Sequence, residues 1–262
     1  MTHYILVHGA WEGSWSWDLT QPALEKAGHK VTSVDLIGSP GNKAEISKVT
    51  LGNYVETVVD AIDQLDHKVV LVGHSLAGAV ISHVAEQIPE KIERLVYVTA
   101  FLLENDDSII EAMQRDPGGQ FLPKLKFSDD GSYATVEEET WRNIAFHDVS
   151  EERILGALPR LLGTKQATDP FIAKSAVSEE NLGSVPKTYI RTSIDKMISP
   201  GLQDEMIAKW HVDSVHTLEA GHFPMLSLPE ELAALLLKEA DQASLASSGE
   251  RPNSQSDFVA AL

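Results

Sequence analysis

The sequence predicts an α/β fold built on a mostly parallel sheet. Short apolar runs rich in β-branched residues recur along the chain, and longer stretches with helical spacing separate them. Strands that alternate with helices pair in parallel, because each crossover returns the chain to the same edge of the sheet. The chain has 262 residues, of which 43% are hydrophobic, so it can bury one substantial core, and we expect a single domain.

About six runs are candidate strands. They cover residues 4–7, 30–35, 69–72, 95–99, 188–192 and 214–218. Four of these runs lead into a cluster of Gly, Ala or Asp residues, which indicates loops at the carboxyl ends of the strands. Because open α/β folds bind their ligands at that edge, we expect the chemistry to lie there.

Three segments have the pattern of helices that flank such a sheet. Residues 53–65 carry an apolar stripe at helical spacing, and the stretch after Gly73 is small and apolar on nearly every side. Residues 230–240 follow Pro229, which suits a first helical turn. The core of the fold is therefore expected to comprise residues 1–100 and 186–240.

The alternation of strands and helices stops between the fourth and the fifth strand. Residues 101–185 contain helical pieces at 137–147 and 151–162, and they are too long for a plain crossover. We expect a helical cap over the carboxyl edge of the sheet. Residues 241–262 are polar and rich in Ser, and we expect them to form a disordered tail.

Composition excludes several classes of function. The formal net charge of -18 repels nucleic acid and anionic lipid. The absence of cysteine excludes disulfide scaffolds, thiolate zinc sites, iron–sulfur clusters and cysteine nucleophiles. Residues 1–7 read as a strand rather than a signal peptide, and no apolar run approaches the roughly 18 residues that span a membrane. We expect a soluble, cytoplasmic protein.

A candidate nucleophile follows the third predicted strand. Residues 69–72 run into Gly73-His74-Ser75-Leu76-Ala77-Gly78 and then into a helix, which is the setting of a nucleophile elbow. Ala77 stands where the commonest form of the motif has Gly, and Gly78 beside it leaves room. The alternative is a turn in which Ser75 only caps a buried helix.

A serine hydroxyl needs a base, and the base needs an acid that orients it. His222 lies between the last predicted strand and the last helix, at the active edge. Asp195 follows the fifth strand and precedes His222, which gives the chain order Ser, Asp, His of α/β-hydrolases. Asp106 and Asp107, after the fourth strand, are the competing acids, although charge at a helix start also explains them.

Other residues at the same edge are assigned supporting roles. The backbone N–H groups of Ala10 and Leu76 are the candidate oxyanion donors. His8 and His74 sit beside tight turns, where we expect them to hold loops in place. His147, in the expected cap, could meet either the substrate or solvent, and we expect solvent. No metal ligands are expected.

These residues resemble those of a known family. The motifs His8-Gly9-Ala10-Trp11, Gly73-His74-Ser75, Thr192-Ser193-Ile194-Asp195-Lys196 and Gly221-His222 are similar to those of small α/β-hydrolases grouped with plant methyl esterases, hydroxynitrile lyases and bacterial carboxylesterases. The resemblance covers about residues 3 to 240. It implies strand order 2-1-3-4-5-6, a helical cap, no cofactor and often a homodimer.

The function expected first is a carboxylesterase that cleaves small esters through an acyl-enzyme. A hydroxynitrile lyase-like enzyme or a cofactor-free oxygenase on the same scaffold is the second expectation, since fold alone does not fix the reaction. A small-molecule receptor that retains the triad is the third. In the hydroxynitrile lyases that this chain resembles, a threonine directly follows the first-strand histidine and a lysine directly follows the catalytic histidine. This chain has Gly9 and Phe223 at those two positions.

Aromatic side chains indicate an apolar substrate pocket. The candidates are Trp11, Phe101, Trp141 and Phe223. Aromatic residues at helical spacing more often form a core than a pocket wall. We therefore expect at most two of the five aromatics Phe101, Phe121, Trp141, Phe146 and Phe171 to face the substrate.

Overall fold

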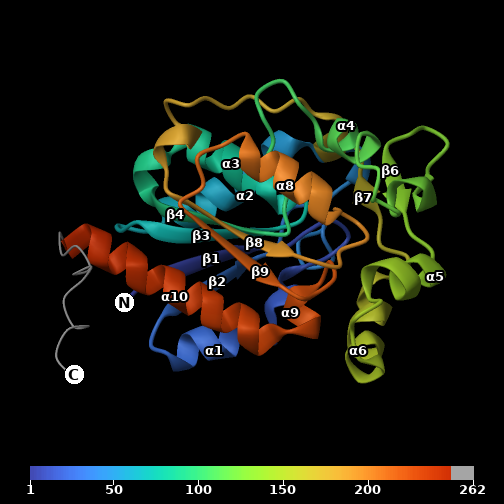
Figure 1. Ribbon diagram of the computed structural model, residues 1–262. Helices are drawn as coiled ribbons and strands as arrows, with labels where there is room; N and C mark the ends of the chain where they lie inside the picture. The colour runs from blue at the N-terminus through green and yellow to red at the C-terminus, as the bar shows by residue number, and fades with distance from the viewer. Residues whose placement is uncertain (249–262) are drawn as a thin grey trace.

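A six-stranded sheet forms the centre of the protein (Figure 1). The structure is a computed structural model that describes residues 1–248. The strand order is β2-β1-β3-β4-β8-β9, and every neighbouring pair is parallel. The strands are β1 (His3–Val7), β2 (Lys30–Val34), β3 (Val69–His74), β4 (Ile92–Val98), β8 (Lys187–Thr192) and β9 (Ser214–Leu218). The six expected strands and the sheet order of the α/β-hydrolase fold are thus confirmed.

Helices cover both faces of the sheet. In Figure 1, α2, α3 and α8 lie on one face, and α1, α9 and α10 lie on the other. These helices are α1 (Gln21–Lys26), α2 (Leu51–Asp63), α3 (Ala77–Gln87), α8 (Pro200–Ala208), α9 (Pro224–Ser227) and α10 (Pro229–Ser248). Strands β1 and β3 are buried along their whole length because both of their faces are covered, which explains their continuous apolar sequence.

The boundaries of helices α2 and α10 differ from the sequence expectation. Helix α2 begins at Leu51 rather than Asn53, because Thr50 and Asn53 form a capping box that makes Asn53 the third residue of the helix. Helix α10 continues to Ser248 instead of ending at Ala240, so the beginning of the segment expected to be disordered is helical. The rest of that expected tail, residues 249–262, lies outside the described residues.

Most of the inserted segment, residues 101–185, lies beyond the carboxyl ends of the strands, and its last part runs back past α3 to the amino end of β8 (Figure 1). Its helices are α4 (Ile109–Gln114), α5 (Glu138–Thr140), α6 (Glu151–Leu161) and α7 (Asp169–Ile172). It also contains a small antiparallel sheet of β5 (Lys126–Phe127), β6 (Tyr133–Thr135) and β7 (Gln166–Ala167), which the sequence pattern did not predict. The helix expected at 137–147 is one α turn followed by a π-helical turn, η5 (Trp141–Ala145).

Short 3-10 helices occur elsewhere in the chain. They are η1 (Ser14–Trp17), η2 (Ile46–Lys48), η3 (Pro89–Lys91), η4 (Leu122–Lys124) and η6 (Leu182–Ser184). Within residues 1–248, no helix has both the length and the apolar character that crossing a membrane requires.

Candidate active site

Ser75 lies in a sharp turn between β3 and α3. Its φ of 54° is in the left-handed region, which is unfavourable for a residue with a side chain. The turn also brings backbones close together. A Cβ at Gly73 would lie 2.8 Å from the carbonyl oxygen of Ala77, and one at Gly78 would lie 2.5 Å from that of Phe101. Glycine is therefore required at 78, whereas position 77 accommodates the buried methyl of Ala77.

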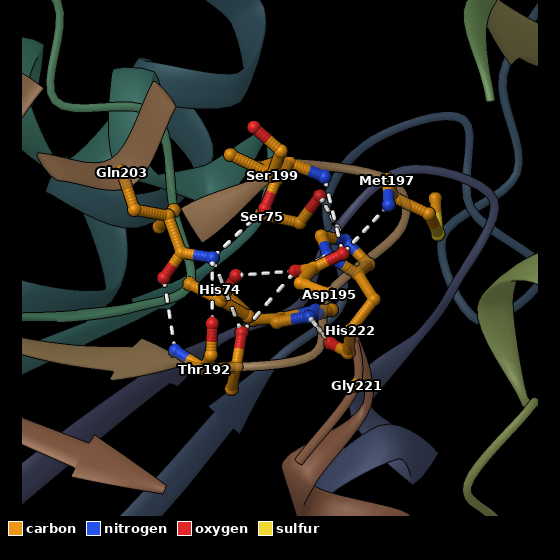
Figure 2. A network of polar contacts seen from close by, with 12 residues as sticks. His74, Ser75, Thr192, Asp195, Met197, Ser199, Gln203, Gly221 and His222 are labelled. Carbon is orange, nitrogen blue, oxygen red and sulfur yellow. Dashed lines mark hydrogen bonds and ion pairs between the residues drawn. The ribbon is translucent and has the colours of Figure 1, made fainter. Parts of the chain in front are cut away.

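Three polar side chains from three different loops meet at this turn. The hydroxyl of Ser75 donates to Nε2 of His222 at 2.8 Å, and Nδ1–H of His222 donates to Oδ2 of Asp195 at 2.7 Å (Figure 2). All three residues are buried. Because Nδ1 carries the proton, Nε2 is free to accept one from the serine.

Further donors fix the carboxylate of Asp195. Its Oδ1 accepts from the backbone N–H groups of Met197 at 2.7 Å and Ile198 at 3.1 Å, and its Oδ2 accepts from the hydroxyl of Thr99 at 2.6 Å. Burial would raise the pKa of this carboxyl, but the electrostatic interaction with His222 and these hydrogen bonds outweigh it and hold the pKa below its ordinary value. Asp195 is thus kept ionised beside the imidazole.

The competing acids lie elsewhere. Asp107 forms an ion pair with Arg115, and the backbone of Asp106 pairs with Ser175. Neither carboxylate contacts His222, which already donates to Asp195.

A small apolar cavity lies beside Ser75. Its volume is about 20 Å³, which is room for about one water molecule. It is bordered by Ala10, Trp11, Glu12, Ser75, Phe101, Met113, Phe121, Phe171, Met197, Ile198, His222 and Phe223. Three of the five aromatics considered above, Phe101, Phe121 and Phe171, therefore border the cavity.

Trp141 was expected in the pocket but does not border this cavity. Its ring is fully buried and packs against Trp11, Phe121, Phe146 and Phe223, with ring centroids 5.7 to 6.4 Å apart. Trp141 therefore supports the aromatic wall from behind. Its position one layer away could not be read from helical spacing alone.

The two predicted oxyanion donors remain available. In the part of the chain that the structure describes, the backbone N–H groups of Ala10 and Leu76 have no protein acceptor. The next residue, Trp11, has a φ of 63°, and its own N–H donates to Oε1 of Gln166 at 3.0 Å. This contact holds the loop after β1 beside the cavity that Ala10 borders.

A buried ion pair beside Ser75 was not predicted from the sequence. Nδ1 of His74 lies 2.9 Å from Oε1 of Glu12, and Nε2 of His74 lies 2.7 Å from the carbonyl oxygen of His222. His74 therefore holds a loop, as expected. Its partner Glu12 stands in a glycine-rich loop that has no periodic pattern. The signal available in the sequence is a charged residue between Trp11 and Gly13.

The inserted segment contacts the loops that carry Asp195 and His222. Nε2–H of His147 donates to the carbonyl of Ile194 at 2.9 Å, and Oδ2 of Asp148 accepts from the N–H of Gly221 at 2.7 Å. A Cβ at Gly221 would lie 2.5 Å from Oδ1 of Asp148. His147 therefore does more than face solvent, because it is bonded to the residue that precedes Asp195.

Sequence comparison finds related proteins along nearly the whole chain. Residues 4–235 match the alpha/beta hydrolase family. Methylesterase 1 from Arabidopsis thaliana is 32% identical over 256 residues, covering 92% of this chain and 96% of that protein. The alpha-hydroxynitrile lyase from the same plant is 30% identical over 248 residues, covering 88% of this chain and 93% of that protein. The chain spans 64% of the length of the putative chloroplastic methylesterase 11 of A. thaliana, at 31% identity.

Structural comparison agrees. The crystal structure of polyneuridine aldehyde esterase has a TM-score of 0.82 at 30% identity, covering 92% of this chain and all of that chain. The resemblance to plant methyl esterases and hydroxynitrile lyases is thus confirmed. The chain belongs to the alpha/beta hydrolase family.

Proposed function

We propose that this protein is a serine carboxylesterase that cleaves small carboxylic esters through an acyl-enzyme. The observation that carries the proposal is the continuous hydrogen-bonded series Ser75–His222–Asp195 beside an apolar cavity. Its methylesterase and esterase relatives support hydrolysis rather than another reaction.

In the first half of the reaction, Oγ of Ser75 attacks the ester carbonyl carbon while Nε2 of His222 takes the hydroxyl proton. The imidazolium that forms is stabilised by Asp195. The N–H groups of Ala10 and Leu76 donate to the oxyanion. The imidazolium then protonates the leaving alkoxide, the carbon–oxygen bond breaks, and the alcohol departs from the acyl-enzyme.

In the second half, a water molecule replaces the alcohol. His222 takes a proton from the water as its oxygen attacks the acyl carbon, and the same two amides bind the second oxyanion. The proton returns to Oγ of Ser75 as the acyl bond breaks. The products are one carboxylic acid and the regenerated serine.

The cavity favours an uncharged, apolar substrate. Apart from Glu12, Ser75 and His222, its lining is apolar, and no cationic side chain among residues 1–248 borders it to pair with a carboxylate. An ester is far larger than the cavity of about 20 Å³, so binding requires the lining side chains to move. We propose that the inserted segment acts as a cap in this movement. A methyl ester, whose leaving group is methanol, demands the least additional space.

Hydroxynitrile lyase activity is the second candidate, because a relative has that name. The residues at two positions disfavour it. A Cβ at Gly9 would lie 2.4 Å from Oε1 of Glu12 and 3.0 Å from Cβ of Ser75, so the threonine of such lyases does not fit there. Phe223 stands in the place of the lysine, and an unpaired cyanide anion in this apolar site would cost several kcal/mol, on the order of 10³-fold or more in rate.

Turnover assays on the purified protein test the proposal. We expect hydrolysis of p-nitrophenyl acetate, p-nitrophenyl butyrate and short methyl esters, and no cleavage of mandelonitrile or acetone cyanohydrin above the uncatalysed rate. Cyanide release at a rate comparable to ester hydrolysis would establish the lyase. Binding of esters without turnover would favour the small-molecule receptor. The cofactor-free oxygenase, the cytoplasmic location and the homodimer stay predictions.

A further inference from the structure

We propose that Glu12 is a positioning residue that keeps His74 doubly protonated, so that His74 holds the backbone carbonyl of His222 and aims its imidazole at Ser75. The inference rests on the esterase function proposed above. It adds to that site a residue that acts on the imidazole of His222 through its neighbour His74.

With Glu12 ionised, the hydrogen-bond pattern calls for two protons on His74. Its Nδ1 faces a carboxylate oxygen of Glu12 at 2.9 Å, and its Nε2 faces the carbonyl oxygen of His222 at 2.7 Å. The carbonyl oxygen is an acceptor in every state, and the Glu12 carboxylate is an acceptor only while it is ionised. A neutral imidazole has a single N–H and can satisfy one of them, whereas an imidazolium satisfies both.

Burial makes this requirement strict. The side chain of His74 is 0% exposed and that of Glu12 is 1% exposed, so bulk water does not reach the two contacts and an unmade hydrogen bond there is costly. Burial alone would lower the pKa of His74, but the charge and hydrogen bond of Glu12 outweigh it and raise the pKa above its ordinary value. Burial would likewise raise the pKa of Glu12, and its attraction to His74 lowers it. Both shifts favour the ionised form of the pair.

The other titratable groups around His74 are Asp195, His8 and His222. The charge of Asp195 favours the imidazolium, and a charge on His8 would oppose it. His8 is neutral in this structure, because its Nε2 accepts from the N–H of Leu36 and its Nδ1 donates to the carbonyl of Gly9. The ring of His222 lies 4.8 Å from that of His74, measured between centroids. Glu12 is thus the carboxylate in direct contact with His74.

The pair connects three loops of the site. Glu12 belongs to the loop after β1, which also carries Ala10. His74 ends β3, directly before Ser75, and His222 follows β9. When His74 loses its proton at alkaline pH, either tautomer leaves one pair of acceptors facing each other. The loop of His222 is then released, so kcat/KM for an uncharged ester should fall at alkaline pH.

The variant Glu12→Gln removes the charge of residue 12 but can keep a hydrogen bond to His74. A glutamine amide can donate to an unprotonated Nδ1 while Nε2–H still donates to His222, so both contacts survive in a neutral pair. We expect the wild type to show two ring N–H protons on His74 at pH 7.5 in ¹⁵N-histidine NMR, and Glu12→Gln to show one. A single ring proton in the wild type overturns the proposal, whatever the enzyme does with esters.

Kinetics supply the second readout. We expect Glu12→Ala to lower kcat by about tenfold or more with a change in KM of less than about threefold. Glu12→Gln should restore part of kcat and lack the alkaline fall. An alkaline profile in Glu12→Gln that matches the wild type would overturn the proposal. If Glu12→Ala does not fold, the NMR and pH comparisons of Glu12→Gln still decide.

Glu239→Gln is the matched control. Glu239 is also a buried carboxylate that pairs with a histidine, His216, and it accepts from Thr188 near the amino end of β8. This variant should keep the wild-type alkaline profile and both ring protons on His74. Loss of either would show that removing any buried carboxylate has the same effect. Failure of Ser75→Ala to abolish turnover would instead refute the esterase assignment and leave the NMR result standing.

Discussion

Asp195→Asn is expected to invert the proton position on His222 while leaving the fold in place. The backbone N–H groups of Met197 and Ile198 both donate to Oδ1 of Asp195, so the asparagine oxygen must take that position. The alternative orientation places an NH₂ group against two N–H donors. It loses two buried hydrogen bonds, at about 1 to 3 kcal/mol each.

The asparagine NH₂ group therefore faces Nδ1 of His222 and the hydroxyl of Thr99. A donor at that place forces Nδ1 to act as an acceptor, and the proton moves to Nε2. Nε2 then cannot take the proton of Ser75. Loss of a correctly oriented base in this way costs about 10⁴ in kcat in a well-studied triad, and we expect a loss of at least 10³ here.

The assay is kcat/KM for p-nitrophenyl butyrate at pH 7.5, with folding checked by circular dichroism and thermal unfolding. Asp116→Asn is the control, because Asp116 is also buried and accepts from Ser199 and Gly118 without contacting His222. If Asp195→Asn keeps more than about one tenth of the wild-type activity, Asp195 does not set the tautomer of His222 and the reasoning is wrong.

Three further predictions concern stability and the loops around the site. Thr99→Val removes a buried donor to Asp195 without changing shape, and it should lower the free energy of unfolding by about 1.5 to 3 kcal/mol at pH 7 in urea titrations; an unchanged midpoint would contradict this. Gly221→Ala places a methyl 2.5 Å from Asp148 and 2.9 Å from His147, which should lower the free energy of unfolding by about 1 to 3 kcal/mol. Because the strain displaces the loop of His222, kcat/KM should fall by about tenfold, and wild-type kinetics would refute the contact. The pKa of Glu12 is lowered in the folded protein, so its contribution to stability is present above its unfolded pKa of about 4.3 and is lost as pH falls through the folded pKa. The melting temperature of Glu12→Gln should therefore decrease less than that of the wild type between about pH 5 and 3, and parallel curves would count against the ion pair.

Local pattern was sufficient to predict the elements that carry the reactive groups. Ser75, Asp195 and His222 each follow a strand whose apolar run is visible in the sequence, and parallel strands bring such positions to one edge. The small residues around Ser75 reflect the close approach of β3 and α3, which is also local. The strands, and the meeting of these three side chains at their carboxyl ends, were therefore predictable from the sequence.

Contacts between distant segments were not predictable in this way. Glu12 and His74 are 62 positions apart, and Thr99 and Asp195 are 96 apart, so no periodicity marks either pair. Whether Trp141 reaches the cavity depends on how aromatic rings stack across the inserted segment. The strands β5, β6 and β7 have two or three residues each, which is too short for an alternating pattern to appear.

The central claim is that Oγ of Ser75 is the nucleophile of an esterase. The most direct test is kcat/KM for p-nitrophenyl butyrate of Ser75→Ala beside the wild type, with the melting temperature of each measured in the same buffer. We predict that the variant unfolds at a similar temperature and that its kcat/KM is lower by at least about 10³, because the base and the oxyanion donors cannot replace the covalent step. Turnover within tenfold of the wild type in a folded Ser75→Ala protein would contradict the account.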